Sequence, residues 1–188
     1  NKETALRILT TSFQNNPGVL WVVKKDKRLH QRINVLCNFC LTVAMQKQGA
    51  YITSDEKGVA LLFKSWLKQN TLQWLLGYIQ LGQYCIGWDR AISIIKREHE
   101  ITRRRPRQRH LYFWMLAVED HTYGLNTIIE MRDFVFANSR KQQLPIYAET
   151  TVKKMLTLYK RYGFRVYDEW DTGKNGVVVY FISRAWDA

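Results

Sequence analysis

The sequence is poor in the features that stabilise secreted or membrane-spanning proteins. Its 188 residues include only three cysteines and three prolines, and 16 acidic residues stand against 29 lysines and arginines. The odd cysteine number and the lack of an apolar leader favour reduced thiols in the cytoplasm. No apolar run reaches the roughly 18 residues that a membrane span requires, so we expect a soluble protein without a membrane partner. The start at Asn1 indicates a processed or trimmed end.

The cysteines also argue against a metal site. Cys37 and Cys40 have the CxxC spacing, but they lie within a helical pattern of apolar residues, and Cys85 is remote in sequence. A zinc site would need a second Cys or His pair at ligand spacing, and none follows. Because free cysteine is among the most buried residue types, we favour a core role and expect no metal.

The residues that are abundant are apolar, aromatic and basic. A hydrophobic fraction of 46%, with 13% aromatic residues, is sufficient for one globular domain over residues 1–188. The formal net charge of +13 favours anionic partners, such as nucleic acid, acidic lipid or a cofactor that carries polyphosphate. Charge alone does not choose among these partners.

The first sixty residues are predicted to form helix, strand, helix and a strand hairpin. Apolar residues recur at the helical period over 3–15 and from Asp26 until Gly49. We interpret Asn16-Pro17-Gly18 as the stop of the first helix, and 19–23 as a short apolar strand. The segments 50–53 and 58–63 flank a four-residue turn, which is typical of a hairpin.

The middle of the chain, residues 64–102, predicts two helices broken near Gly87. The aromatic residues between Trp66 and Trp88 are interpreted as the core of a helical layer, with a substrate pocket as the alternative. The run that follows, Thr102–His110, contains five arginines and Pro106. We favour a solvated loop there, and a contact to phosphate or nucleic acid is the functional alternative.

The C-terminal half alternates buried strands with helices. Strands are predicted at 110–118 and 144–148, each followed by a helix, at 128–138 and 152–162. Two final strands, 164–170 and 177–183, are separated by the turn-rich segment DTGKNG and form a closing hairpin. The sequence therefore predicts a sheet completed by its last strands.

This order of elements resembles the GNAT N-acetyltransferase superfamily. The resemblance rests on LAV at 116–118, LPIYAET at 144–150 and TVKKMLTLYKRYGF at 151–164, while GVALLFK at 58–64 is similar to the puromycin acetyltransferase-like branch. It implies an α/β (α+β) fold with a central mixed, mostly antiparallel, twisted sheet of six or seven strands. Helices flank that sheet, and the family's fourth and fifth strands splay apart.

The resemblance also implies acetyl-CoA as co-substrate. In the family, the backbone at the end of the fourth strand pairs with pantetheine, and the corresponding residues here are Leu116, Ala117 and Val118. A turn that opens a helix after a buried strand suits a pyrophosphate, because unpaired N–H groups and the helix dipole point at it. The family motif Q/R-x-x-G-x-G/A falls on Tyr123, Gly124, Leu125, Asn126, Thr127 and Ile128. Tyrosine therefore replaces its first residue, and Asn126 and Ile128 replace its glycines.

The candidate catalytic residues lie in the same half of the chain. Tyr159 falls where the family has the general acid that protonates the leaving CoA thiolate, and Met155 falls where the family often has an asparagine that contacts the cofactor. Glu119, at the strand end, is the first candidate for the base that deprotonates the amine, and Glu149 is the second.

Two functional hypotheses follow from these observations. In the first, the protein transfers an acetyl group from acetyl-CoA to a primary amine of a small molecule by direct attack. In the second, a degenerate GNAT domain without catalysis uses the Arg103–Arg109 run to bind nucleic acid or another polyanion. The sequence does not identify the amine acceptor, and it does not show whether the protein forms a homodimer.

Overall fold

The computed structural model describes the chain except for residues 69, 120–124 and 174–175. Within the described residues, six strands form one sheet in the order β1-β2-β3-β4-β6-β5. Only β3 and β4 are parallel, and every other pair of neighbours is antiparallel. The strands are β1 (Ala50–Ile52), β2 (Gly58–Lys64), β3 (Leu111–Val118), β4 (Ile146–Thr150), β5 (Arg165–Asp171) and β6 (Val178–Arg184). The predicted mixed, mostly antiparallel sheet is confirmed.

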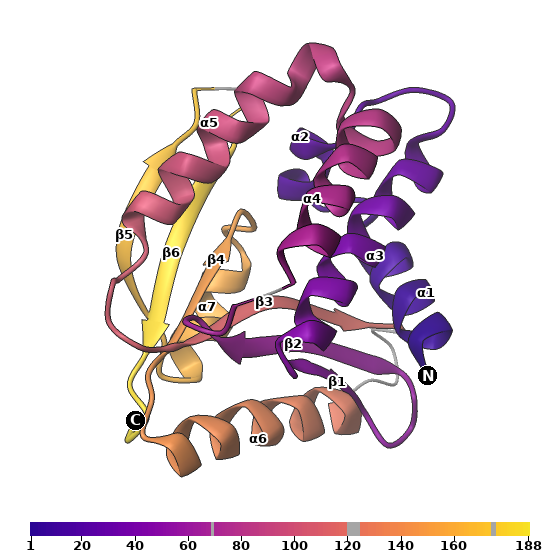
Figure 1. The fold of residues 1–188 in the computed structure, drawn as a ribbon. Helices are drawn as coiled ribbons and strands as arrows, with labels where there is room; N and C mark the ends of the chain where they lie inside the picture. Colours follow the sequence, from indigo (N-terminus) through magenta and orange to yellow (C-terminus); the bar gives the residue numbers. More distant parts are fainter. Residues whose placement is uncertain (69, 120–124, 174–175) are drawn as a thin grey trace.

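Helices cover both faces of this sheet (Figure 1). One group consists of α1 (Lys2–Phe13), α2 (Pro17–Val22), α3 (Leu29–Gln46), α4 (Thr71–Gln80), the π-helical segment η1 (Leu81–Ile86) and α5 (Trp88–Arg104). The other group consists of α6 (Leu125–Gln142) and α7 (Met155–Arg161). None of the helices in the described part of the chain has the length and apolar character needed to span a bilayer.

Each face of the sheet carries its own apolar core. Met115 and Ala117 of β3 pack with α1, α3 and η1, whereas Leu116 and Val118 pack with α6 and α7. Neighbouring strand residues point to opposite faces, so the continuous apolar run of β3 supplies both cores. Cys37, Cys40 and Cys85 are buried in the first core, as expected, and burial raises the pKa of the Cys37 and Cys85 thiols to about 12.

The two central strands separate soon after they meet. β3 pairs with β4 only at Leu111, Tyr112 and Phe113, opposite Ile146, Tyr147 and Ala148. β3 then continues beside β2, while β4 continues beside β6. Figure 1 shows the two strands side by side at one end and diverging from there. This divergence confirms the predicted splay.

The prediction of a strand over residues 19–23 is wrong, because residues 19–22 belong to the helix α2 and Val23 is its C-cap. Asn16 is its N-cap, and its side-chain oxygen accepts hydrogen bonds from the amides of Gly18 at 2.9 Å and Val19 at 3.2 Å. Pro17 occupies the first turn, where the missing N–H costs nothing and the ring favours helical φ. Asn16 and Pro17 therefore start a second helix as well as ending the first.

The Asn16→Ala variant should lower the free energy of unfolding by about 1 kcal/mol, because two amides of a packed helix lose their acceptor. Denaturant unfolding measures this loss. Asn70→Ala is the matched control, since Asn70 caps α4 in the same way, with amides at 3.1 and 3.2 Å. Because α4 has no buried residue, that variant should cost less. Equal losses in both variants would contradict this account.

The interpretation of residues 64–102 as a core layer is wrong for α4. Every side chain of α4 is at least partly exposed, and Trp88, Ile92 and Ile95 of α5 are exposed as well. The break near Gly87 is confirmed, and the residue has a φ of 84°, which glycine adopts without strain. Apolar periodicity does not show whether another element covers a helix face, and in the described part of the chain these side chains stay exposed.

α5 packs inward through arginines spaced seven residues apart. Arg90 donates to the carbonyls of Trp21 and Val23 at the end of α2, at 2.5 and 2.6 Å, and the Arg97 guanidinium lies 4.5 Å from the Trp21 ring centre. Arg104, still within α5, pairs with Asp168 of β5 at 2.7 Å. The predicted loop therefore begins later than Thr102, because these side chains anchor the last turn of the helix.

Candidate active site

The divergence of β3 from β4 leaves one side of the predicted thioester-binding segment without a partner strand among the described residues. In the part of the chain that the structure describes, Leu116, Ala117 and Val118 pair with β2 on one side and with no strand on the other. A ligand with amide groups can add to such an edge. The Val118 carbonyl already accepts a hydrogen bond from the Ser12 hydroxyl at 2.9 Å. Helix α1 therefore borders the site at this end.

Glu119 follows directly at the end of β3. Its backbone amide donates to the Lys57 carbonyl at 2.8 Å, and its carboxylate forms an ion pair with Arg7 of α1. The Glu119 side chain is one-third exposed, at 33%, and Arg7 is more exposed, at 55%. The carboxylate is thus tethered at the surface and remains open to solvent.

The predicted pyrophosphate turn is described only from Leu125 onward, so Tyr123 and Gly124 lie outside the described residues. Leu125 and Asn126 are exposed at the start of α6. The first amides of a helix have no partner within the helix, and the dipole makes that end positive. These two side chains are therefore exposed at the first residues of α6, an 18-residue helix.

The next two residues fasten α6 to the sheet. Thr127 is buried, and its hydroxyl donates to the Asp55 carboxylate at 2.5 Å in the turn between β1 and β2. That bond is the main reason why the pKa of Asp55 lies below its ordinary value, and a second bond from Thr53 adds to it. Ile128 packs into the core formed with α7. Both side chains point into the protein, so a ligand at this end would meet the backbone.

Tyr159 lies on α7, half-buried against the same core as Leu116, Val118 and Ile128. Its ring contacts Phe164 edge-on, with centres 5.4 Å apart. Burial raises the pKa of its phenol above the ordinary value, so the group keeps its proton at neutral pH. Ala117 belongs to the opposite core, and Met155 is half-buried in the first turn of α7. The fold thus collects four of the predicted residues on one side of the sheet.

Glu149 on β4 belongs to a largely buried network of three side chains. Arg105 donates through Nε to one carboxylate oxygen at 2.7 Å, and the Tyr112 hydroxyl donates to the other at 2.6 Å. Arg105 also donates to the Tyr112 oxygen at 2.6 Å, and its guanidinium lies 4.1 Å from that ring centre. Only 12% of the Glu149 side chain is exposed. Both of its oxygens are engaged within the protein.

The electrostatics of this network favour a stable charge pair. Burial acts to lower the pKa of Arg105, but its interactions with Tyr112 and Glu149 outweigh burial and raise it. Burial is also the main cause that raises the pKa of Tyr112 well above its ordinary value. Arg105 therefore stays charged and Tyr112 stays a neutral donor, so the network holds Glu149 in place.

No protein-family model matches the chain, and no curated protein sequence matches it. Solved structures do. A structure described as histone acetyltransferase HPA2 and related acetyltransferase, from Corynebacterium glutamicum, has a TM-score of 0.69 at 16% identity and covers 98% of this chain and 90% of its own. Arylalkylamine N-acetyltransferase 2 from Aedes aegypti has a TM-score of 0.60 at 12% identity, with 98% and 95% covered. The chain has the GNAT acetyltransferase fold.

A third similar structure broadens the range of GNAT-fold neighbours. The C-terminal condensation domain of Ebony, in complex with β-alanyl-dopamine, has a TM-score of 0.66 at 13% identity and covers 98% of this chain and 93% of its own. Identities this low establish the fold alone. The likeness to the puromycin branch stays a prediction.

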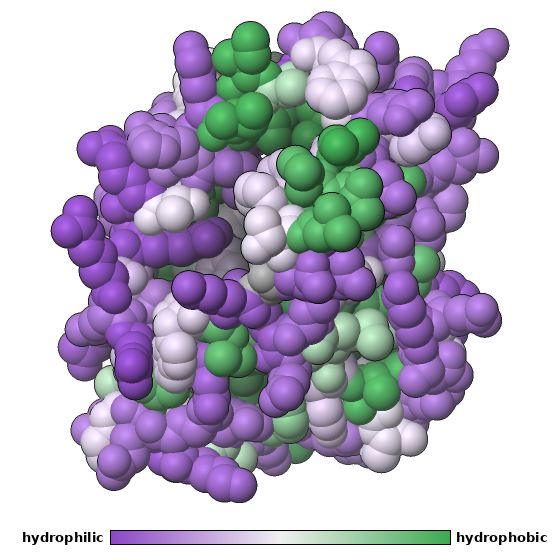
Figure 2. Space-filling view, in the orientation of Figure 1, coloured by the Kyte–Doolittle hydropathy of each residue, from purple (hydrophilic) through white to green (hydrophobic). Residues whose placement is uncertain are grey.

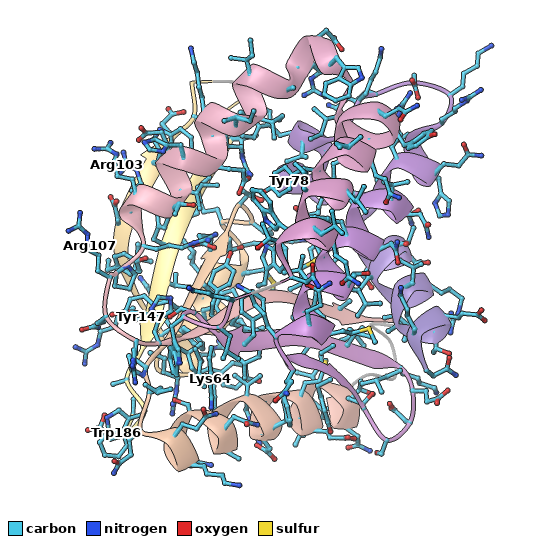
Figure 3. The ribbon with its side chains drawn as sticks, viewed as in Figure 1. Lys64, Tyr78, Arg103, Arg107, Tyr147 and Trp186 are labelled. Atoms are coloured by element: carbon cyan, nitrogen blue, oxygen red, sulfur yellow. The ribbon has the colours of Figure 1, made fainter. Side chains whose placement is uncertain are left out.

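In this GNAT-fold protein, sequence analysis missed Arg105 and Tyr112 as partners of Glu149. Arg105 belongs to the arginine run that we interpreted as solvated, and Tyr112 belongs to a strand that shows only apolar periodicity. Arg103 and Arg107 do extend into solvent (Figure 3), and Arg103 pairs with Glu100 at 2.8 Å. Pro106 is the local signal that the helix ends at Arg104, because a proline disfavours helical backbone at the residue before it. The described residues contain no group of three His, Cys, Asp or Glu side chains that could hold a metal.

Proposed function

We propose that the protein is an N-acyltransferase that moves an acetyl group from acetyl-CoA to the primary amine of a small molecule. The observation that carries the proposal is the separation of β3 from β4 after three paired residues. It leaves one side of β3 without a partner strand from Leu116 to Val118. Backbone groups on that side, apart from the Val118 carbonyl that Ser12 already engages, would pair with the amides of pantetheine. A closed sheet would offer no such edge.

The start of α6 is the proposed position of the CoA pyrophosphate. Its first amides and its positive dipole end follow β3 within a few residues, and Asn126 is exposed there. Because Thr127 and Ile128 point into the protein, the wrap around the phosphates comes from backbone groups. The net charge of +13 adds a general attraction for a polyphosphate.

In the proposed reaction, the neutral amine attacks the thioester carbonyl, so that a C–N bond forms and the C–S bond breaks. Backbone amides of β3 polarise the carbonyl. Tyr159 gives its phenol proton to the CoA sulfur, which leaves as a thiol. Its raised pKa keeps the phenol protonated at neutral pH, so that a proton is available when the thiolate forms. No covalent enzyme intermediate is needed, since both substrates are held together.

Glu119 is the proposed base that takes the amine proton, directly or through water. Its carboxylate is partly exposed at the end of β3 and has Arg7 as its ion-pair partner. Glu149 is less suited to this role, because Arg105 and Tyr112 already occupy both of its oxygens. We assign Glu149 to holding β4 in position instead.

Aromatic amines are the acceptor class to test first. The names of two neighbours point that way, an arylalkylamine N-acetyltransferase and a condensation domain in complex with β-alanyl-dopamine. This chain also has aromatic side chains on the helix α4, where Trp74 and Tyr78 lie 4.4 Å apart between ring centres. Such rings would contact an aryl group through their faces and edges.

Isothermal titration with acetyl-CoA should give measurable binding in the micromolar range. Asn126→Asp should weaken the affinity about tenfold, because a carboxylate beside the pyrophosphate repels it. Gln143→Glu is the matched control, since it adds the same charge at an exposed site beyond the other end of α6 and should change the affinity less than about twofold.

The absence of binding heat at a few hundred micromolar acetyl-CoA would overturn the proposed function, since that limit corresponds to about 5 kcal/mol of affinity. The alternative of a GNAT-fold module that binds polyanions would then be tested with nucleic acid at increasing salt. Equal weakening in Asn126→Asp and Gln143→Glu would place the pyrophosphate away from the start of α6.

A further inference from the structure

The helices α4 and α5 expose an apolar face that the proposed chemistry does not use. Figure 2 shows apolar side chains over α4 and over the N-terminal half of α5 on one face of the molecule. We define the α4–α5 apolar face by residues that are each between 45% and 70% exposed, namely Leu72, Leu75, Leu76, Ile79, Tyr84, Trp88, Ile92 and Ile95. Monomeric proteins rarely leave such a contiguous set uncovered.

The spacing of these residues is that of amphipathic helices turned outward. Leu72, Leu75, Leu76 and Ile79 are three and four residues apart, as are Trp88, Ile92 and Ile95. The inward side of α5 is occupied separately by Ile94, Ile101 and the three anchoring arginines. The apolar face is therefore a second, independent face, and packing within the described chain does not explain it.

Basic residues outnumber acidic ones at both ends of this face, where Asp26 and Asp89 are the exposed carboxylates. The loop after α2 carries Lys24, Lys25, Lys27 and Arg28, all exposed, and the Lys24 amide donates to the Cys85 carbonyl at 3.0 Å, next to Tyr84. Lys68 precedes α4, and Lys96 lies one turn after Ile92. The sequence has no acidic residue between Glu56 and Asp89. Apolar helices with basic margins are typical of proteins that lie on anionic membranes.

A cavity at the start of α4 has two lysines in its lining. It has a volume of about 370 Å³ and is lined by Lys47, Leu67, Lys68, Thr71 and Trp74. Burial, with a smaller effect of Arg105, lowers the pKa of Lys47, whose ammonium lies 4.6 Å from the Phe63 ring centre. A phosphate would compensate this partly buried cation, and the Thr71 hydroxyl could donate to it.

We propose that the α4–α5 apolar face rests on the surface of an anionic phospholipid bilayer, with a headgroup phosphate in the cavity between Lys47 and Lys68. The proposal shares Trp74 with the suggested contact to an aromatic acceptor and otherwise uses residues outside the acyltransferase chemistry. A second copy of the chain is the less suitable occupant, because two faces with the same basic margins would meet on molecules that each carry a net charge of +13. The earlier expectation of no membrane partner rested on the length of a spanning segment, which surface binding does not need.

Co-sedimentation with vesicles tests this proposal. The wild type should bind vesicles of phosphatidylcholine mixed with phosphatidylglycerol, and binding should fall at least about tenfold with phosphatidylcholine alone or at high salt. The Leu75→Glu/Leu76→Glu variant should bind at least about tenfold more weakly, and Lys47→Gln several-fold more weakly. Leu125→Glu is the matched control, because Leu125 is 70% exposed on α6, outside this face, and its replacement should leave binding unchanged.

Three results would overturn the proposal. The first is no sedimentation of the wild type with anionic vesicles at low salt. The second is equal binding by wild type and Leu75→Glu/Leu76→Glu, which would show that charge alone attracts the protein. The third is a wild-type dimer in analytical ultracentrifugation that the double variant converts to monomer, since a second copy would then cover the face. Circular dichroism of each variant checks that its fold is retained.

Discussion

The Tyr159→Phe variant should acetylate its amine acceptor at least about 100-fold more slowly than the wild type, with acetyl-CoA affinity unchanged. The substitution removes only the hydroxyl, so the packing of the ring against Phe164 remains. Without the proton donor, the CoA sulfur must leave as a thiolate. Fixed-time assays of the released CoA thiol measure the rate, and isothermal titration measures the affinity for acetyl-CoA.

The pH dependence separates a proton donor from a packing residue. Because burial raises the pKa of Tyr159, the donor is protonated throughout the neutral range and is lost only as the pH rises above that raised value. The wild-type rate should therefore rise with pH as the amine deprotonates and should fall only in strong alkali. Tyr159→Phe should lack that alkaline fall.

Tyr162→Phe is the matched control for this experiment. Tyr162 is also half-buried and follows α7 directly, with its ring 6.3 Å from that of Phe136. Its rate should stay within about twofold of the wild type. Full turnover by Tyr159→Phe would show that this phenol has no role in the mechanism. It would not bear on acetyl-CoA binding, which the titration tests separately.

The Arg105→Met variant should lower the free energy of unfolding by about 3 kcal/mol or more, because it leaves Glu149 largely buried without its cation. The pair is mostly shielded from solvent, with 24% of the Arg105 side chain and 12% of the Glu149 side chain exposed. Methionine keeps much of the aliphatic volume, so the loss reports on the charge. Urea unfolding followed by circular dichroism measures it.

Two comparisons show whether this loss comes from the unpaired carboxylate. Arg103→Met breaks an exposed pair with Glu100 and should cost under about 1 kcal/mol. The double variant Arg105→Met/Glu149→Leu should recover a large part of the stability, because no buried charge is left without a partner. A single Arg105→Met variant as stable as Arg103→Met would show that the network contributes little.

Local patterns were sufficient where one segment's chemistry decides its structure. The unbroken apolar run of β3 predicted a strand covered on both faces, and both cores now contain its residues. The same patterns failed at α2, where Asn16 and Pro17 are equally good signals for a helix start and a helix stop. An N-cap is recognised by the hydrogen bonds that its side chain accepts from two backbone amides. These bonds form only when the residues after the cap are helical, which the sequence signal alone does not show.

The sequence by itself determined the order of most elements, the excess of positive charge and the residues that share each helical face. Only the tertiary structure decided that α4 keeps an exposed apolar face, that Arg105 meets Glu149 from 44 residues away, and that β3 and β4 part after three residues. Helical and strand periods identify which side chains point the same way. These periods do not show which distant segment packs against a given face, because that depends on the packing of the whole chain.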